Sequence, residues 1–526
     1  MSRAPLITLL VLLLPSPAQA WELELDLGLY NRLTVQANHV DRLLRWDTAA
    51  GGFAVDRYLA PRLDRTYYGL YARAAAHLEA TPWLGFGLAV DSGLFDPTGR
   101  VPRAGEVRLG PATYKGVNLP AYNAPVTTTE DERKVTANGQ PVGDEARQTF
   151  FIRQAYMRLS APETGWLAAT LGRQSLEVGG GLIYNDSGLG AELLLDFEAL
   201  RDVPLRASLK VLLPTRAWDE GLRSPLVELR VDYVFSSFLS LVESVGLSVA
   251  FFHDGDDNIS RLLDSTISEA VVQHYPDVNT AVVDYAAAGA LAYSPWSKAN
   301  IVWIGLSGRK LLGDLLLSAN LQLEVGKLQL ENPFWALTGG AALPSFLPQD
   351  EVLRLSTLGF AAEVTASYLV SEALSVGGFF LLLTGGENPY TPGQTQGKYG
   401  SFLAVMPYIT HTNLFFSGGM NETFSGRQAT TAGINGRGVV AFGPNVAWEI
   451  IEGLDVGATA AALFAPVASR TGGSFYGVEV DLEGSYQVLS WLKVSAQYDF
   501  LAAGNFFPRQ KVIHQFLFGL DVTYER

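Results

Sequence analysis

Apolar and polar residues alternate along most of this chain with a period of two. From residue 21 to residue 29 every second position is apolar, and the positions between them carry Glu22, Glu24, Asp26 and Gly28. Successive side chains of a β-strand point to opposite faces, so this pattern predicts a strand with one apolar and one acidic face. A helix would mix the two sets around its circumference.

The same alternation recurs to the end of the chain. It is clearest over residues 68–78, 84–90, 207–213, 227–233, 315–325, 476–482, 492–500 and 516–524. Short turns, near 81–82, 161–165, 371–373, 452–453 and 489–490, alternate with long polar connections such as 92–147 and 254–298. Counting the runs predicts about 18 strands, with a range of roughly 16 to 20. Residues 284–310 and 400–421 could each hold one strand or two.

The composition of the apolar faces points to a membrane. The strands are rich in Leu, Phe and Tyr over about 10 residues, the length that a tilted strand needs to cross a bilayer. Trp83, Trp166 and Trp491 lie at or just after short turns, as the aromatic girdle of a membrane barrel would require. Charged residues make up 17% of the chain, whereas about a quarter is typical of soluble domains. We therefore expect an all-β fold, a closed transmembrane antiparallel β-barrel, in preference to a soluble β-sandwich or β-helix.

The N-terminus has the features of a secretory signal peptide. Arg3 is followed by an apolar run over residues 6–14 and by Ala18-Gln19-Ala20, a small-x-small cleavage site. We expect residues 1–20 to be removed after Ala20 and residues 21–526 to form the barrel with long extracellular loops. An uncleaved membrane anchor is the alternative, but the run is short for a membrane-spanning helix. The expected location is the outer membrane of a Gram-negative bacterium.

Other features of the composition exclude several kinds of chemistry. The chain has no Cys, and its 6 His residues show no spacing typical of a zinc site. A net charge of −15 argues against binding to nucleic acid. No arrangement of Ser, His and Asp indicates a hydrolase, so we expect no enzyme activity, no catalytic residue, no metal and no cofactor. The run 253–258 resembles part of a calcium loop but lacks the closing Glu, which favours a solvated extracellular loop.

Charged residues on the polar strand faces are the candidate functional residues, because those faces would line the lumen. The expected acidic set gathers near the seam between the first and last strands: Glu22, Glu24, Asp26, Glu479, Asp481, Glu483, Asp499 and Asp521. The expected basic set lies on another part of the wall: Arg158, Arg173, Arg206, Lys210 and Arg230. The direction of Arg173 depends on whether the alternation breaks at Gly172. Opposed walls of this kind would select solutes by charge, although lumenal residues of large barrels are generally polar.

Two segments resemble alginate-export-type porins and related large porins. The first is QTFFIRQAYMRLSAPETGWLAATLGRQSLEVG at 148–179, with an RxAY strand, a turn and a GRQ strand. The second, at 475–507, contains Gly477-x-Glu479-x-Asp481 and Tyr498-x-Phe500-x-x-x-Gly504. The resemblance implies an 18-stranded barrel that exports an anionic polysaccharide through an Arg-lined pore.

These observations favour an outer-membrane channel that passes hydrophilic solutes, with polysaccharide export as the more specific hypothesis. The expected partners are outer-membrane lipid, a polysaccharide or small hydrophilic solute, and periplasmic export proteins. The alternative is a non-conducting structural or machinery-anchoring barrel whose loops bind other proteins.

Overall fold

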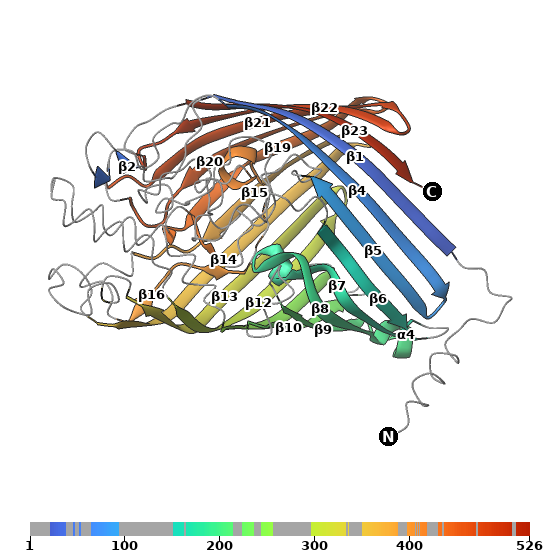
Figure 1. Ribbon diagram of the computed structural model, residues 1–526, viewed down its shortest axis with the longest axis horizontal. Helices are drawn as coiled ribbons and strands as arrows, with labels where there is room; N and C mark the ends of the chain where they lie inside the picture. The colour runs from blue at the N-terminus through green and yellow to red at the C-terminus, as the bar shows by residue number, and fades with distance from the viewer. Residues whose placement is uncertain are drawn as a thin grey trace, which may run out of the picture.

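The computed structural model shows a closed antiparallel barrel of 18 strands (Figure 1). The structure describes residues 22–37, 46–47, 52–53, 65–93, 151–161, 165–213, 224–235, 243–255, 296–332, 335, 350–387, 397–405, 407, 409, 411–417, 430–433, 436–469, 472–507 and 512–525. The expected fold class and the expected strand number are therefore confirmed.

The barrel strands follow one another around the wall in chain order. In the first half of the chain they are β1 (Glu22–Ala37), β4 (Arg65–Thr81), β5 (Leu84–Gly93), β6 (Phe151–Ser160), β7 (Leu167–Val178), β8 (Tyr184–Asp196), β9 (Leu205–Leu213), β10 (Leu226–Val234) and β11 (Ser244–Asp254). In the second half they are β12 (Ser297–Leu312), β13 (Leu315–Glu331), β14 (Val352–Ser371), β15 (Leu374–Leu383), β19 (Val439–Ile451), β20 (Leu454–Phe464), β21 (Phe475–Leu489), β22 (Leu492–Ala503) and β23 (Val512–Glu525).

The remaining elements are short. They are β2 (Trp46–Asp47), β3 (Gly52–Phe53), η3 (Gly179–Gly181), α4 (Phe197–Arg201), β16 (Lys398–Tyr399), β17 (Leu403–Ala404), η5 (Asn413–Ser417) and β18 (Thr430–Thr431). Among the described residues, no helix combines the length and the apolar character needed to cross a membrane.

Pairing of the first strand with the last closes the barrel. β1 and β23 are antiparallel in a register that runs from Asp26 opposite Glu525 to Ala37 opposite His514. The short turns gather at one end of the barrel and the long connections at the other, and the C-terminus lies at the turn end (Figure 1). In bacterial barrels the short turns are generally periplasmic and the long loops extracellular, so we expect the same orientation for this barrel.

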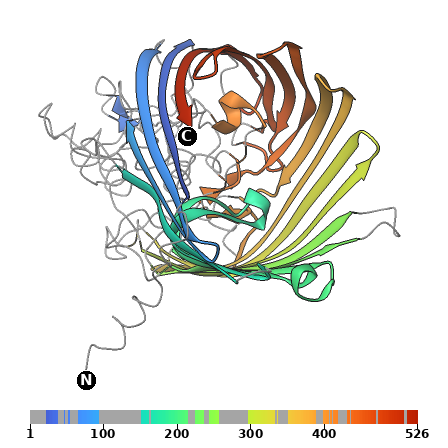
Figure 2. The same ribbon diagram turned by 90° about the vertical axis from the view of Figure 1, so that its right-hand side faces the viewer.

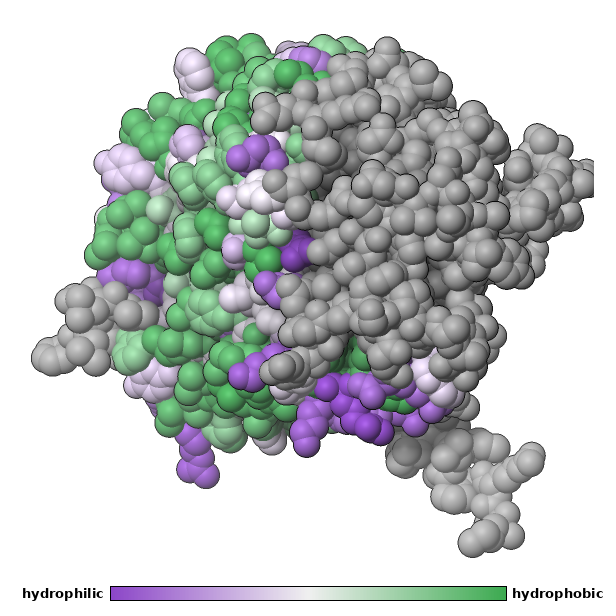
Figure 3. All heavy atoms as spheres, turned by 90° about the vertical axis from the view of Figure 1, so that its left-hand side faces the viewer, coloured by the Kyte–Doolittle hydropathy of each residue, from purple (hydrophilic) through white to green (hydrophobic). Residues whose placement is uncertain are grey.

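The outer surface is apolar, as the alternation predicts. On β1 the side chains of Leu23, Leu25, Leu27 and Leu29 are exposed on the outside of the barrel. Exposed apolar side chains continue around the wall, and much of the described surface in Figure 3 is hydrophobic. In a soluble protein such a surface would be a large aggregation hazard, whereas in a bilayer it contacts lipid.

The inner surface changes character along the barrel axis. On β13 the lumen-facing residues near the loop end are Leu328 and Leu330, and those toward the turn end are Asn320, Gln322 and Glu324. The outward-facing Leu323 on the same strand is exposed. The loop half of the lumen can therefore bury apolar side chains of an inserted segment, while the turn half stays polar.

Some sequence expectations need correction, and others lie outside the described residues. The described residues between 400 and 417 contain no strand of the barrel wall: their apolar side chains lie inside the lumen, where the period-two rule for a lipid-facing strand does not apply. Over 284–310 the structure describes one strand, β12, and residues 284–295 are outside the described part. The proposed signal peptide at 1–20 and most of the 92–147 connection are also outside it.

Candidate functional site: a constricted lumen

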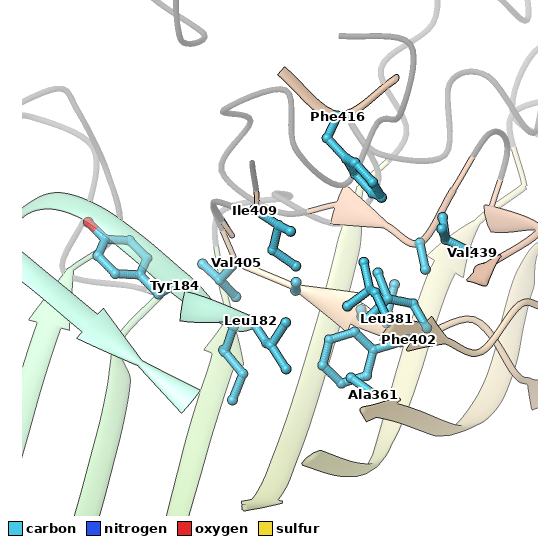
Figure 4. Packing of buried hydrophobic residues seen from close by; sticks show 14 of the residues in the cluster. Leu182, Tyr184, Ala361, Leu381, Phe402, Val405, Ile409, Phe416 and Val439 are labelled. Atoms are coloured by element: carbon cyan, nitrogen blue, oxygen red, sulfur yellow. The ribbon is translucent and has the colours of Figure 1, made fainter. Parts of the chain in front are cut away.

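The connection between β15 and β19 enters the barrel instead of staying at its rim. We call the described residues between 401 and 417 the strap; it contains β17 and η5 and lies inside the ring of strands (Figure 2). Its apolar side chains are buried, including Phe402, Leu403 and Leu414. They form part of one hydrophobic cluster with lumen-facing residues of the wall, such as Leu381 and Val439 (Figure 4).

The tip of the β7–β8 hairpin, residues 178–184, also turns into the lumen. Gly179 N–H donates to Glu228 Oε1 of β10 at 2.9 Å, and Asn320 Nδ2 of β13 donates to the Gly179 carbonyl at 2.8 Å. Gly180 has a φ of 62°, and a Cβ there would lie 2.4 Å from Asn320 Nδ2, so this close approach requires glycine.

The strap and the hairpin tip contact each other. Val405 N–H donates to the carbonyl of Ile183 at 2.8 Å, and Leu182 belongs to the same buried cluster as Val405 (Figure 4). The strap and the hairpin tip, more than 200 residues apart in sequence, are thus packed together inside the lumen.

One end of the strap is bonded to β12 and β13. Leu403 N–H donates to Glu324 Oε2 at 2.6 Å, and Trp303 Nε1 donates to the Leu403 carbonyl at 3.1 Å. Both wall side chains are fully buried. A buried backbone N–H that is left unpaired is costly, so a wall carboxyl group at this position stabilises the inserted loop.

The other end of the strap is bonded to carboxyl groups of β21 and β22. Glu479 accepts from Thr412 Oγ1 and Phe415 N, both at 2.9 Å, and from Leu414 N. Asn413 donates through its backbone N–H to Asp481 Oδ2 at 3.0 Å and through Nδ2 to Asp499 Oδ1 at 3.1 Å. The carboxyl groups therefore meet the first residues of η5, whose N–H groups have no partner within that short helix.

The structure divides the expected acidic residues into groups with different surroundings. Glu479, Asp481 and Asp499 are buried beneath the strap. Glu483 and Asp521 line a cavity of about 650 Å³ at the turn end, together with Glu449, Asp455 and Lys493. Glu24 on β1 is exposed and Asp26 is half-buried, while the side chain of Glu22 is outside the described set.

Three of the expected basic residues form ion pairs on the lumenal face. Lys210 Nζ lies 3.0 Å from Glu228 Oε2, Arg230 Nη2 lies 2.8 Å from Asp232 Oδ1, and Arg206 Nε lies 3.0 Å from Asp196 Oδ2. Sequence reasoning did not select the three acidic partners. The alternation places Glu228 and Asp232 on the same strand face as Arg230. The sequence pattern could therefore have indicated these two carboxyl groups as neighbours of Arg230.

The other two basic residues lie on opposite sides of the sheet. Arg158 is exposed, and it is opposite Gly85, on the lumenal side with Tyr156. Arg173 is opposite Ala155 and shares its side with Leu171, an exposed residue of the outer surface. The strand keeps its register through Gly172, so the register places Arg173 on the outward side.

The segment that resembles a calcium loop is tied to its neighbours at its start. Asp254 is buried and accepts from Ser297 Oγ at 2.5 Å, and Gly255 N–H donates to Ser224 Oγ at 3.0 Å. Across the described residues, no group of three His, Cys, Asp or Glu side chains could hold a metal ion.

No protein-family profile matches this chain, and no curated protein matches it in sequence. Its fold is similar to that of solved structures. One is Pseudomonas aeruginosa OccK9 (OpdG), with 12% identity and a TM-score of 0.48, covering 96% of this chain and 99% of that one. Others are Acinetobacter baumannii OccAB1, with 8% identity, a TM-score of 0.47 and 96% of each chain covered, and Pseudomonas aeruginosa OpdK with vanillate, with 10% identity, a TM-score of 0.45 and 96% and 99% covered. At these values the likeness assigns neither a family nor a function to this chain.

Proposed function

We propose that this barrel is a passive channel for small hydrophilic solutes in the outer membrane of a Gram-negative bacterium. The observation that carries the proposal is the combination of a polar lumenal face, which bears Asp, Glu, Lys and Arg side chains, with two inserted segments, the strap and the hairpin tip, that narrow the lumen. A barrel that served only as a scaffold would need neither such side chains facing its interior nor a defined constriction.

The charge arrangement favours cations over anions as permeating ions. The 650 Å³ cavity at the turn end is lined by Glu449, Asp455, Glu483 and Asp521 and by one cation, Lys493. Three of the lumen-facing cations elsewhere on the wall have a carboxyl oxygen within 3.0 Å, which compensates their charge locally. Uncompensated negative charge therefore prevails in this cavity, and such a lining attracts cations.

Export of a polysaccharide is a narrower form of this proposal. It is supported by the resemblance of residues 148–179 and 475–507 to alginate-export-type porins. The carboxyl partners of Lys210, Arg206 and Arg230 compensate positive charge that could otherwise bind an anionic polymer, and the inserted segments narrow its route. We therefore favour single small solutes as cargo.

Planar-bilayer recording tests the proposal directly. The purified barrel should show discrete single-channel steps, and its reversal potential in a KCl gradient should indicate a preference for K⁺. Replacing Asp455→Asn together with Glu483→Gln should reduce that preference, and the reduction should be largest at low salt, where screening is weak. Absence of current from correctly folded protein would overturn the channel proposal and support the non-conducting alternative.

A further inference from the structure

The bonds between the strap and β21 have a consequence for the width of the channel. We infer that Glu479, assisted by Asp481, is the positioning residue that holds the strap across the lumen and so sets the size of solute that can pass. The effect on solute size rests on the proposed channel function. The anchoring of the strap by Glu479 can be measured without recording any current.

The first support is the number and order of the contacts at Glu479. Thr412, Leu414 and Phe415 all donate to its two carboxyl oxygens, through one hydroxyl and two backbone N–H groups. Asp481, two residues further along the same face of β21, takes the backbone N–H of Asn413. Four consecutive strap residues are therefore fixed by two neighbouring wall side chains, which defines both the position and the direction of the strap.

The second support is the cost of placing these groups where they are. Glu479 and Asp499 are fully buried, and Asp481 is nearly so, in a region whose other wall residues include Tyr476 and Leu501. Burying carboxyl groups side by side is unfavourable unless they accept hydrogen bonds. Apolar residues at these positions would complete a barrel wall equally well, so the carboxyl groups serve the strap and not the strand.

The third support is that the strap is held at separated places on the wall. Between its two ends, His411 Nε2 lies 2.8 Å from Glu363 Oε1 of β14. Its start is bonded to Glu324 on β13 and its end to Glu479 on β21, and β14, β15, β19 and β20 lie between those strands in the sheet. A segment tied at both ends crosses the lumen as a chord. Release of one tie would let η5 move away from β21 and β22 and widen the opening.

The absence of Cys from the whole chain provides a clean measurement of anchoring. Leu414→Cys keeps the backbone N–H that Glu479 accepts and introduces one thiol at a buried position. We expect the folded protein to react slowly with a small water-soluble maleimide. Adding Glu479→Ala should raise the rate by roughly tenfold or more, because two buried N–H groups lose their acceptor. Glu479→Gln keeps one acceptor oxygen but turns an NH2 donor toward a strap donor, so it should raise the rate by a smaller factor than Glu479→Ala.

Two further variants separate anchoring from general effects of mutation. Glu483→Ala removes an exposed carboxyl group from the same face of the same strand and should leave the labelling rate unchanged. Thr412→Val leaves the wall intact and deletes only the hydroxyl donor, so it should raise the rate by a smaller factor even if Glu479→Ala folds poorly. Equal labelling of the parent, Glu479→Ala and Thr412→Val proteins, or equal acceleration by Glu483→Ala, would overturn the inference.

The effect on channel size is measured by the largest polyethylene glycol that reduces single-channel conductance. Glu479→Ala should conduct more than the wild type, admit larger polymers and show a noisier open level. If labelling increases while the polymer limit stays at the wild-type value, Glu479 anchors the strap but does not set the aperture, and the inference fails. A wild-type protein that carries no current, yet shows the labelling pattern above, would instead refute the channel proposal.

Discussion

The ion pair between Lys210 and Glu228 gives the sharpest test of how the lumen is held together. Its nitrogen and oxygen are 3.0 Å apart, and the side chains are 12% and 0% exposed. Lys210 also donates to the Glu177 carbonyl, and Glu228 accepts from Gly179, so the pair supports the inserted hairpin tip. Lys210→Met should destabilise the folded barrel by about 3–5 kcal/mol, because it leaves a buried carboxyl group without its counter-charge.

Urea titrations of the protein refolded into lipid vesicles measure this loss as a free energy of unfolding. The double variant Lys210→Met with Glu228→Gln should recover part of it, with a coupling energy of about 0.5–3 kcal/mol. The matched control is Arg206→Met, whose partner Asp196 lies at the same 3.0 Å distance but whose side chain is 53% exposed. That change should cost only about 0–1 kcal/mol. Similar losses for Lys210→Met and Arg206→Met would refute the reasoning that burial decides the strength of these pairs.

Two more changes probe the wall itself. Leu323→Arg, in the middle of β13 on its exposed outer face, should lower the free energy of unfolding by about 2–4 kcal/mol in the same urea titration. Leu312→Arg, at the turn end of β12, should lower it by only about 0–1 kcal/mol. Equal losses would contradict the assigned depth of these residues in the membrane. Gly172→Ala should cost about 1–3 kcal/mol, because φ is 125° and a Cβ would lie 2.3 Å from the Ala155 carbonyl oxygen. The control Gly484→Ala, where the nearest atom to a Cβ is 3.8 Å away, should be nearly neutral. A neutral Gly172→Ala would show that the backbone moves to relieve this contact without a measurable cost in stability.

The barrel could be predicted from the sequence because the bilayer imposes a simple rule on each strand. Leu323 and Val325 must be apolar to face lipid, and Gln322 and Glu324, which alternate with them, must face inward. This rule repeats along the described wall strands, so the strand number and most lumenal faces follow from the alternation, whereas Arg173, expected in the lumen, lies on the outward side by its register. The alternation also places Glu479 and Asp481 on the inner face.

The inserted segments could not be predicted, because the alternation of apolar and polar residues applies only to strands that contact lipid on one face. Phe402 to Val405 and Leu414 to Phe416 are short apolar runs without alternation, and sequence alone does not tell whether such a run meets lipid or other side chains. For the same reason the pattern could not distinguish Glu479, covered by backbone N–H groups, from Glu483, which faces an open cavity. Both carboxyl groups occupy the same kind of position on one strand.

The seam between β1 and β23 has a consequence for biosynthesis. Asp26 and Glu525 are partners in the sheet although they lie near opposite ends of the sequence, so the pairing that closes the barrel joins the first-made strand to the last-made one. Closing so large a loop is entropically expensive, and the contact is unavailable until β23 has been made. Until then β1 has an unpaired edge of backbone donors and acceptors, which invites pairing with other chains. A cell that makes this protein must therefore shield the growing chain and deliver it to the membrane before the seam can form.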